Sequence, residues 1–456
     1  MDNKVFAGAI MARIQNEGDE GGDMKRMDGK PGKATFRHLC VWMLSLLLVS
    51  AAARADAVLD WNKIAVDTAV ANQQNPFAQA RYAAIVQVAV FEAVNAIKKD
   101  YKPYLGTITA SPRASAQAAA IEAAYKVLST YFTDPTSQTA LAADRTQSLA
   151  SIPNNQAKLD GIAVGDAAAQ AMIALRANDG SSPPRFKIPG PPVPGVWQAT
   201  PSCPIVNGIA VGIAFQWGNV TPFGIRHASD FLLSPPPALT SNRYARTYNE
   251  VMTVGSIDST ERPLDRANVA LFYAAASPTQ VFNQAARQVA VQQQRSLSEN
   301  ARALALINMA MNDSLVAAFF NKYHYNFWRP ETAIHAGDMD GNRKTEGDPD
   351  WAPFIVTPCF PSYPSNHGSA ANGAAAVMKQ LYGKAGHWIT LTNTAVPTIV
   401  LHYTSFGEIT DDISDARVYG GIHYRTDQVA GAVLGRAIGR AVYKNNLRPV
   451  HDDYDD

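Results

Sequence analysis

The stretch KYHYNFWRP, residues 322–330, closes a long apolar pattern that predicts a helix over residues 296–321. Lys322 and Arg329 are seven residues apart, close to two helical turns, so on a continuous helix they would share one face. Pro330 disfavours the α conformation at Arg329 and predicts that the helix ends there. We therefore expect two cationic head groups at a helix C-terminus, facing the cavity beyond it.

A second stretch, PSNH at residues 364–367, precedes the Ala-rich run GSAANGAAAVM. That run predicts a helix over residues 367–383, with Ser365 at its N-terminal cap or first turn. The free backbone N–H groups of a helix N-terminus and the helix dipole both favour an anion. His367 would then lie at the edge of an anion-binding nest.

The third group comprises Arg417, His423 and Asp427. On a helix predicted over residues 421–445, His423 and Asp427 are neighbours, and Asp427 can accept a hydrogen bond from one ring nitrogen of His423. That bond fixes the tautomer and leaves the other nitrogen free as a ligand or a nucleophile. Arg417 precedes a Gly-Gly pair, so we expect it on the turn that leads into this helix.

Each group has a plainer interpretation when it is taken alone. Cations at a helix end usually form a solvated face, and a histidine near a helix start is usually on the surface or satisfied. A His–Asp pair four apart is often only structural. Together the groups supply three cations, a helix N-terminus and two histidines, which a tetrahedral oxyanion such as phosphate or vanadate needs. The net charge of +1 gives no electrostatic basis for nucleic-acid binding.

The three stretches resemble the signature of the type-2 phosphatidic-acid-phosphatase and vanadium-dependent haloperoxidase superfamily. That signature is Lys, six residues, Arg-Pro; then Pro-Ser-Gly-His; then Ser-Arg, five residues, His, three residues, Asp. The contexts FPSYPSNH, residues 360–367, and FWRP, residues 327–330, look more like the haloperoxidase branch. The resemblance is sharpest over residues 300–440.

The resemblance implies a role for each motif residue. The oxyanion-binding set would be Lys322, Arg329, Ser365, Asn366 through its backbone N–H, and Arg417. The catalytic set would be His367 as the acid–base group, His423 as the vanadium ligand or, in a phosphatase, the nucleophile, and Asp427 as the residue that orients His423. Phe360 would line the pocket near the halide path.

Two positions depart from the family pattern. Asn366 replaces the motif glycine, which keeps the backbone donor but tolerates φ > 0 and a close ligand approach less well. The amide of Asn366 is also a candidate to bind an oxygen of the anion or a peroxide. Ala416 replaces the serine before Arg417 and removes one hydroxyl. We interpret both changes as tuning of the site.

Periodicity predicts an all-α helical-bundle protein of 456 residues, with no strand run. Further helices are expected at residues 76–97, 114–131, 137–151, 156–178, 240–254, 263–276, 278–292 and 387–409. A long Pro/Gly-rich loop is expected at residues 180–240, between the N-terminal and the C-terminal helices. A loop of this length could form a wall of the active site or a strap on the surface. The resemblance implies two four-helix-bundle halves, 56–240 and 241–450, with the site in the second. Residues 337–350 are interpreted as an ordinary turn, because they lack the glycine and glutamate of a calcium loop.

Residues 1–55 are expected to be an N-terminal extension and a signal peptide. A basic segment, a short apolar run and the triplet Ala53-Arg54-Ala55 fit such a signal, with Met24 as a plausible true start. The alternative is an N-terminal membrane anchor. A signal peptide predicts that the protein is secreted or periplasmic. Cys203 and Cys359 would then lie in an oxidising compartment. The sequence leaves open whether the two cysteines pair.

Three functions follow from these features. The leading hypothesis is a secreted haloperoxidase that uses bound vanadate to activate hydrogen peroxide and oxidise a halide to hypohalous acid, with a small organic acceptor. The second is an acid phosphatase that works through a phosphohistidine. The third is an anion-binding scaffold that has lost the reaction. No stable membrane insertion is expected after signal cleavage, and the oligomeric state is not predicted.

Overall fold

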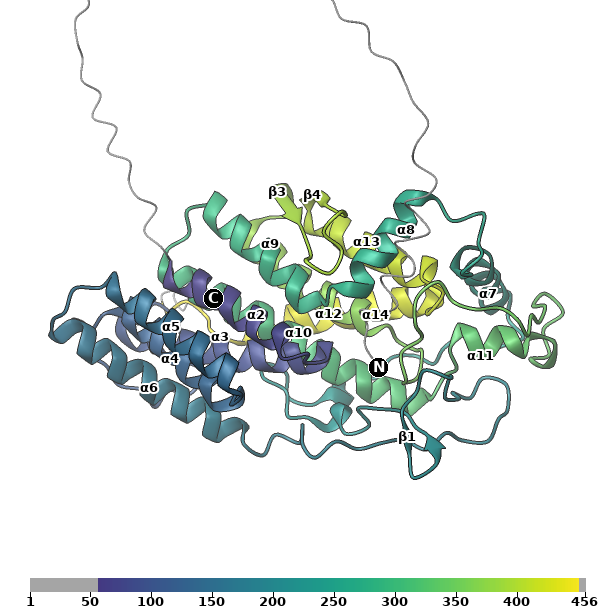
Figure 1. Ribbon diagram of the computed structural model, residues 1–456, viewed down its shortest axis with the longest axis horizontal. Coiled ribbons are helices and arrows are strands. Elements are labelled where there is room, and N and C mark those ends of the chain that lie inside the picture. The colour runs from purple at the N-terminus through teal and green to yellow at the C-terminus, as the bar shows by residue number, and fades with distance from the viewer. Residues whose placement is uncertain (1–55, 451–456) are drawn as a thin grey trace, which may run out of the picture. The chain divides into compact units, whose positions relative to one another are not determined.

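The structure is a computed structural model that describes residues 56–450 (Figure 1). The predicted signal peptide, its cleavage triplet and the start at Met24 lie outside the described residues. The described residues belong to one compact unit. The prediction of an all-α helical fold is confirmed, with two short hairpins as additions.

Five helices form the N-terminal part of this unit, and each begins after an Asp, Asn or Ser whose side chain accepts a backbone N–H. They are α2 (Ala57–Ala71), α3 (Pro76–Lys98), α4 (Ala116–Tyr131), α5 (Pro135–Ala150) and α6 (Gln156–Arg176). The four predicted helices in this region are confirmed, and α2 was not predicted. Helix α6 packs closely on α4, because a Cβ at Gly161 would lie 2.3 Å from Ser115 O.

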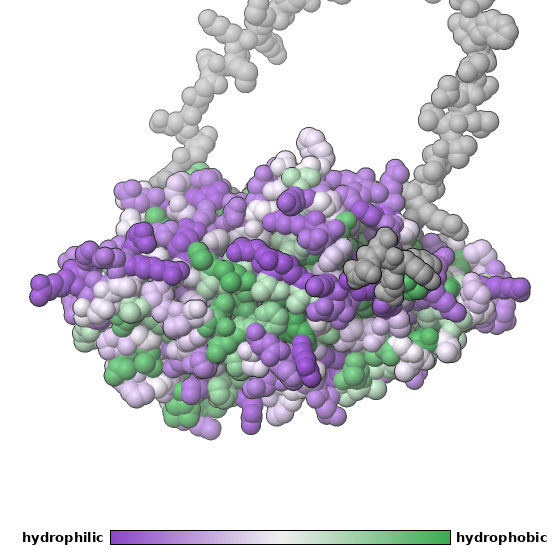
Figure 2. Space-filling model, turned by 180° about the vertical axis from the view of Figure 1, so that it is seen from behind, coloured by the Kyte–Doolittle hydropathy of each residue, from purple (hydrophilic) through white to green (hydrophobic). Residues whose placement is uncertain are grey.

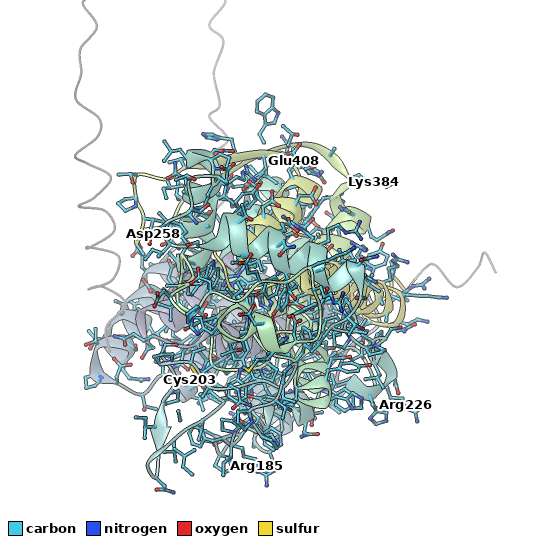
Figure 3. All side chains as sticks on the ribbon, turned by 90° about the vertical axis from the view of Figure 1, so that its right-hand side faces the viewer. Arg185, Cys203, Arg226, Asp258, Lys384 and Glu408 are labelled. Carbon is cyan, nitrogen blue, oxygen red and sulfur yellow. A yellow bond between two sulfur atoms is a disulfide. The ribbon has the colours of Figure 1, made fainter. Side chains whose placement is uncertain are left out.

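The predicted central loop is largely irregular. It contains the two-residue strands β1 (Ile205–Val206) and β2 (Ile209–Ala210), which pair antiparallel, and the 3₁₀ helices η1 (Trp217–Asn219) and η2 (Ala228–Phe231). Cys203 in this loop forms a disulfide with Cys359, which settles the pairing that the sequence left open (Figure 3). The disulfide ties the loop to the residue directly before Phe360.

The C-terminal part contains the remaining helices. They are α7 (Asn242–Gly255), α8 (Leu264–Ala275), α9 (Pro278–Gln292), α10 (Leu297–Tyr325), α11 (Pro330–His335), η3 (Gly337–Met339), α12 (Asn366–Tyr382), α13 (Phe406–Tyr419) and α14 (Arg425–Asn445). The helices predicted at 240–254, 263–276, 278–292, 296–321, 367–383 and 421–445 are confirmed to within a few residues.

The helix predicted over residues 387–409 is wrong. This segment forms β3 (Ala385–Leu391) and β4 (Leu401–Ser405), an antiparallel pair, before α13 begins at Phe406. Glutamines of α9 complete the free edge of β3: the side chain of Gln288 donates to Thr390 O at 2.8 Å and accepts Thr390 N–H at 2.9 Å. Gln292 pairs with the backbone of Trp388 in the same way. The edge of β3 is paired by side chains of another helix, and such contacts are not visible in the sequence pattern of the strand itself.

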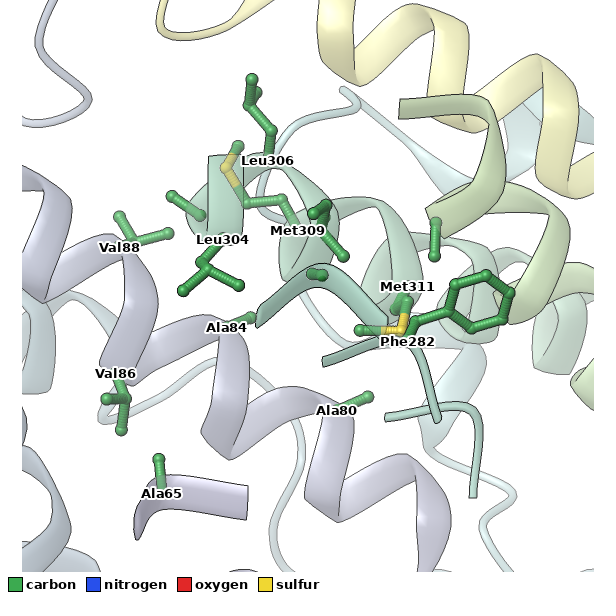
Figure 4. Close-up of a cluster of buried hydrophobic side chains, with 14 of the residues drawn as sticks. Ala65, Ala80, Ala84, Val86, Val88, Phe282, Leu304, Leu306, Met309 and Met311 are labelled. Carbon is green, nitrogen blue, oxygen red and sulfur yellow. The ribbon is translucent and has the colours of Figure 1, made fainter. Parts of the chain in front are cut away.

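Helices α3 and α10 run through the centre of the fold, where their side chains meet those of α9 (Figure 4). Both are long and apolar enough to cross a membrane by length and composition, but most of each is buried inside this unit, as in the core helices of a globular fold. Buried residues of both predicted halves belong to the same hydrophobic cluster. The division at residue 240 therefore stays a prediction.

Helices α12 and α14 approach so closely that their backbones are nearly in contact. A Cβ at Gly431, Gly435 or Gly439 of α14 would lie 2.7, 2.1 or 2.4 Å from a carbonyl oxygen of α12. These glycines are four residues apart, so they form one stripe along α14. The stripe brings the N-terminal ends of α12 and α14 together. On the face drawn in Figure 2 hydrophobic residues gather near the middle, among hydrophilic ones.

Candidate active site

Lys322 and Arg329 are both completely buried, but they do not share a helix face as predicted. Helix α10 ends at Tyr325, and its C-cap Asn326 has left-handed backbone with φ of 49°. Arg329 is instead the N-cap of α11. The prediction of a continuous helix to Arg329 is therefore wrong, because the chain turns at Asn326 before Pro330 can end it.

The backbone carbonyls of one short segment, residues 360–362, accept hydrogen bonds from both cationic side chains. Nζ of Lys322 donates to Pro361 O at 2.7 Å and to Ser362 O at 2.8 Å. Nε of Arg329 donates to Phe360 O at 2.9 Å. The half-buried Phe360 ring lies 5.2 Å from Nζ of Lys322 and 5.1 Å from the guanidinium carbon of Arg329. The predicted pocket residue therefore contacts both cations.

The central loop is hydrogen-bonded to the segment that precedes Arg329 and to the segment that follows Phe360. The backbone of residues 195–197 bonds to that of residues 326–328, because Trp197 N–H donates to Asn326 O and Trp328 N–H donates to Gly195 O. Tyr363 donates its hydroxyl to Ser234 O at 2.7 Å. The long loop therefore packs against the segments that carry the cations, which favours the predicted wall over the surface strap.

The N-terminus of α12 has the predicted form. Ser365 is its N-cap and accepts Gly368 N–H at 3.1 Å. Asn366 is the first helical residue and does not have a positive φ, so a glycine is not required there. Oδ1 of Asn366 is buried and has no partner within the described part of the chain. His367 is half-buried on the first turn, and its imidazole makes no hydrogen bond to any of residues 56–450.

Arg417 lies in the last turn of α13 and not on the turn that leads into α14, so that prediction is wrong. Its side chain is buried, and Nη1 donates to Tyr273 O at 2.9 Å. Nε of Arg417 has no partner among the described residues. Like Arg329, it is a buried guanidinium with a free donor.

His423 precedes α14, and Asp427 lies in the first turn of that helix. The predicted pair is formed, with Nδ1 of His423 at 2.8 Å from Oδ2 of Asp427. Nη1 of Arg329 lies 3.0 Å from Nε2 of His423. Because an ionised carboxylate only accepts and a guanidinium only donates, this network assigns the proton to Nδ1 and the lone pair to Nε2.

Ser362 belongs to the site although the sequence did not assign it a role. Its hydroxyl donates to Oδ2 of Asp427 at 2.6 Å and lies 3.4 Å from Nδ1 of His423. The residue is completely buried. It lies within the FPSYPSNH context that carries the family resemblance, which is the only signal that could have singled it out.

The electrostatics of the cluster favour an anion. Lys322, Arg329 and Arg417 are all buried, and among the described residues Asp427 is the only buried carboxylate whose charge acts on Lys322 and Arg329. Burial lowers the pKa of Arg329 to about 9 and the pKa of Arg417 to about 10, and it lowers the pKa of Lys322 well below its usual range. Burial raises the pKa of Asp427 to about 6. Buried cations without counter-charges are costly, so an anion would stabilise the cluster.

The same burial and the same positive charges affect the pKa values of His367 and His423. Burial and the three cations lower the pKa of His367 and of His423 well below the ordinary value, so both rings are neutral at pH 7. Within residues 56–450, Nη2 of Arg329 and Nε of Arg417 are donors without a partner. The same residues contain no group of three or more His, Cys, Asp or Glu that could hold a metal cation. The donors present fit an oxyanion.

Parts of this chain are similar to known proteins. A family model described as the VCPO second helical-bundle domain matches residues 302–452, the region that holds all of the site residues. The chain is 25% identical to vanadium chloroperoxidase from Curvularia inaequalis, over 44% of each chain. The chain therefore resembles the vanadium haloperoxidases in its C-terminal region. The alignment spans less than half the length of that curated relative.

Solved structures of vanadium-dependent haloperoxidases share the fold of this chain. A bacterial vanadium-dependent iodoperoxidase superposes with a TM-score of 0.73 at 23% identity, covering 86% of this chain and 97% of that one. A bacterial vanadium-dependent chloroperoxidase in its apo form gives a TM-score of 0.65 at 15% identity, covering 81% and 94%. At these identities the likeness establishes the fold alone.

Proposed function

We propose that the protein is a vanadium-dependent haloperoxidase that binds vanadate, takes hydrogen peroxide and a halide as substrates, and releases hypohalous acid to a small organic acceptor. The observation that carries the proposal is the buried cluster of three cations whose guanidinium donors Nη2 of Arg329 and Nε of Arg417 lack partners. The resemblance to the vanadium haloperoxidases supports vanadate as the oxyanion that this cluster would bind.

The chain's own residues would hold the anion from three sides. Lys322, Arg329 and Arg417 would donate to its oxygens. The hydroxyl of Ser365 and the backbone N–H of Asn366 would donate from the N-terminus of α12, where the helix dipole adds favourable potential.

His423 and His367 would have two different roles, as the vanadium ligand and as the acid–base group. Nε2 of His423 carries the lone pair and would be the vanadium ligand, while Asp427 holds Nδ1–H. Bound vanadate would supply a Lewis acid that activates peroxide without a change in oxidation state. His367 is neutral and free of hydrogen bonds within the described chain, so it would accept and return the proton of the peroxide.

The compartment remains part of the proposal. The signal-like segment before residue 56 supports export, and the Cys203–Cys359 disulfide is the kind of bond that persists in an oxidising compartment. We propose a secreted or periplasmic protein on these two grounds.

The test is reconstitution of purified protein with orthovanadate, followed by peroxide-dependent halogenation of a phenol dye with chloride, bromide and iodide. His423→Ala should abolish turnover, whereas His402→Ala, at an exposed position on β4, should leave it unchanged. Vanadate binding without turnover of any halide would sink the proposal. Rapid hydrolysis of p-nitrophenyl phosphate, inhibited by vanadate, would then assign the site to a phosphatase.

A further inference from the structure

Ser362 joins the separate parts of the oxyanion site. Its hydroxyl donates to Oδ2 of Asp427 at 2.6 Å, and its carbonyl accepts from Nζ of Lys322 at 2.8 Å. The same hydroxyl lies 3.4 Å from Nδ1 of His423. A single buried residue therefore contacts the catalytic pair and one of the anion-holding cations.

The backbone on both sides of Ser362 is held in place. Its N–H donates to Phe327 O at 2.8 Å, which ties it to the chain just before Arg329. The preceding carbonyls of Phe360 and Pro361 accept from Arg329 and Lys322, and Cys359 is anchored by its disulfide. Because the backbone is held at several points, the Ser362 hydroxyl has a defined direction.

The two oxygens of Asp427 are used unequally. Oδ2 accepts from the Ser362 hydroxyl, from Tyr424 N–H at 3.2 Å and from Nδ1 of His423. Oδ1 has no partner among the residues that the structure describes. A carboxylate that could turn would exchange its oxygens, so the Ser362 hydroxyl helps to select the oxygen that faces His423.

We propose that Ser362 is a positioning residue of the active site, which holds Asp427 so that His423 keeps its Nδ1–H tautomer and offers Nε2 to the oxyanion, and which aims Lys322 through its carbonyl. The inference rests on the proposed function of this site. A purely structural serine would affect stability when it is replaced, but it would not change the tautomer of His423.

The experiment compares Ser362→Ala with Ser298→Ala, which removes another buried serine hydroxyl at the far end of α10. Orthovanadate and phosphate affinities are measured by calorimetry. The tautomer of His423 is read at fixed pH from long-range ¹H–¹⁵N spectra of histidine-labelled protein, with His423→Gln to assign the signals. Ser362→Ala should weaken anion binding about 10- to 100-fold and move His423 from the Nδ1–H form toward a mixture of tautomers. Ser298→Ala should change neither quantity.

Unchanged affinity and unchanged ¹⁵N shifts in a folded Ser362→Ala protein would overturn the inference. If that variant does not fold, Ser362→Cys keeps a weaker donor of similar shape and should give a smaller change in the same direction, and no change would again overturn it. The tautomer is measured without peroxide or halide. A wild-type protein with no haloperoxidase turnover would therefore contradict the proposed function while leaving the test of Ser362 intact.

Discussion

Oδ2 of Asp427 lies 2.8 Å from Nδ1 of His423, although the two residues belong to different pieces of local structure. His423 precedes α14, and Asp427 lies within its first turn. The same carboxylate oxygen accepts Tyr424 N–H, a free donor of the helix start. One side chain therefore caps the helix and orients the imidazole, so the start of α14 and the chemistry of His423 are coupled.

Replacing Asp427 with asparagine should impair the site while leaving the fold intact. The amide can present an N–H to Nδ1 and so favour the opposite tautomer, with the proton on Nε2. We expect orthovanadate affinity to fall about 10- to 100-fold in a calorimetric titration. Asp67→Asn, which removes an exposed ion pair with Lys63 on α2, is the control. Equal affinities of Asp427→Asn and wild type would contradict the assigned tautomer.

Arg417→Met should weaken anion binding without destabilising the anion-free protein. Burial lowers the pKa of Arg417 to about 10, so its charge is held at a cost when no anion is bound. We expect phosphate and vanadate affinity to drop about 10- to 100-fold, the range for a charged hydrogen bond. The rise in Tm caused by saturating phosphate should shrink in proportion. Arg440→Met, on the exposed face of α14, should keep the full rise.

The pKa of His367 should rise when an oxyanion binds. Burial and the charges of Arg417, Lys322 and Arg329 lower this pKa in the anion-free protein, so the ring is neutral at pH 7. An anion at the centre of these cations offsets their repulsion of a protonated imidazole, which favours the charged form. An NMR titration of His367 with and without phosphate measures the change. A pKa that does not move on binding would mean that His367 does not face the anion.

Gly435→Ala should separate α12 from α14 and destabilise the protein. The new Cβ would lie 2.1 Å from Ser369 O, a backbone atom that cannot give way without moving the helix. We expect a loss of about 1–3 kcal/mol or more in the free energy of unfolding. Gly407→Ala on α13 is the matched control, because its Cβ would find its nearest neighbour at 3.5 Å. That variant should be neutral or more stable by about 0.5 kcal/mol.

Cys203→Ser should destabilise the protein through the unfolded state. The disulfide spans 156 residues, and closing a long loop removes much conformational freedom from the unfolded chain. We expect a loss of about 2–4 kcal/mol in chemical denaturation. Cys359→Ser and the double variant should lose the same amount as the single one. A double variant clearly weaker than either single variant would mean that each cysteine has a separate role.

Much of the helical architecture was predictable because its determinants are local. Pro76 after Asn75, Ser296 with Glu299, and Ser365 before an Ala-rich run each place a helix start within a few residues. The helix predicted over 387–409 failed for the opposite reason. Its strand edge is completed by Gln288 and Gln292, about a hundred residues earlier in the chain, and no local pattern reports such contacts.

The sequence by itself identified the candidate residues of the oxyanion site except Ser362, because their types and order resemble a family pattern and because N-caps and helix periods are local properties. Only the tertiary structure decided how they meet. It placed Arg329 beyond the end of α10 and Arg417 inside α13, and it brought Ser362 between Lys322 and Asp427. The physical reason is that a buried site also depends on hydrogen bonds between residues as far as 94 positions apart, which only the folded chain makes.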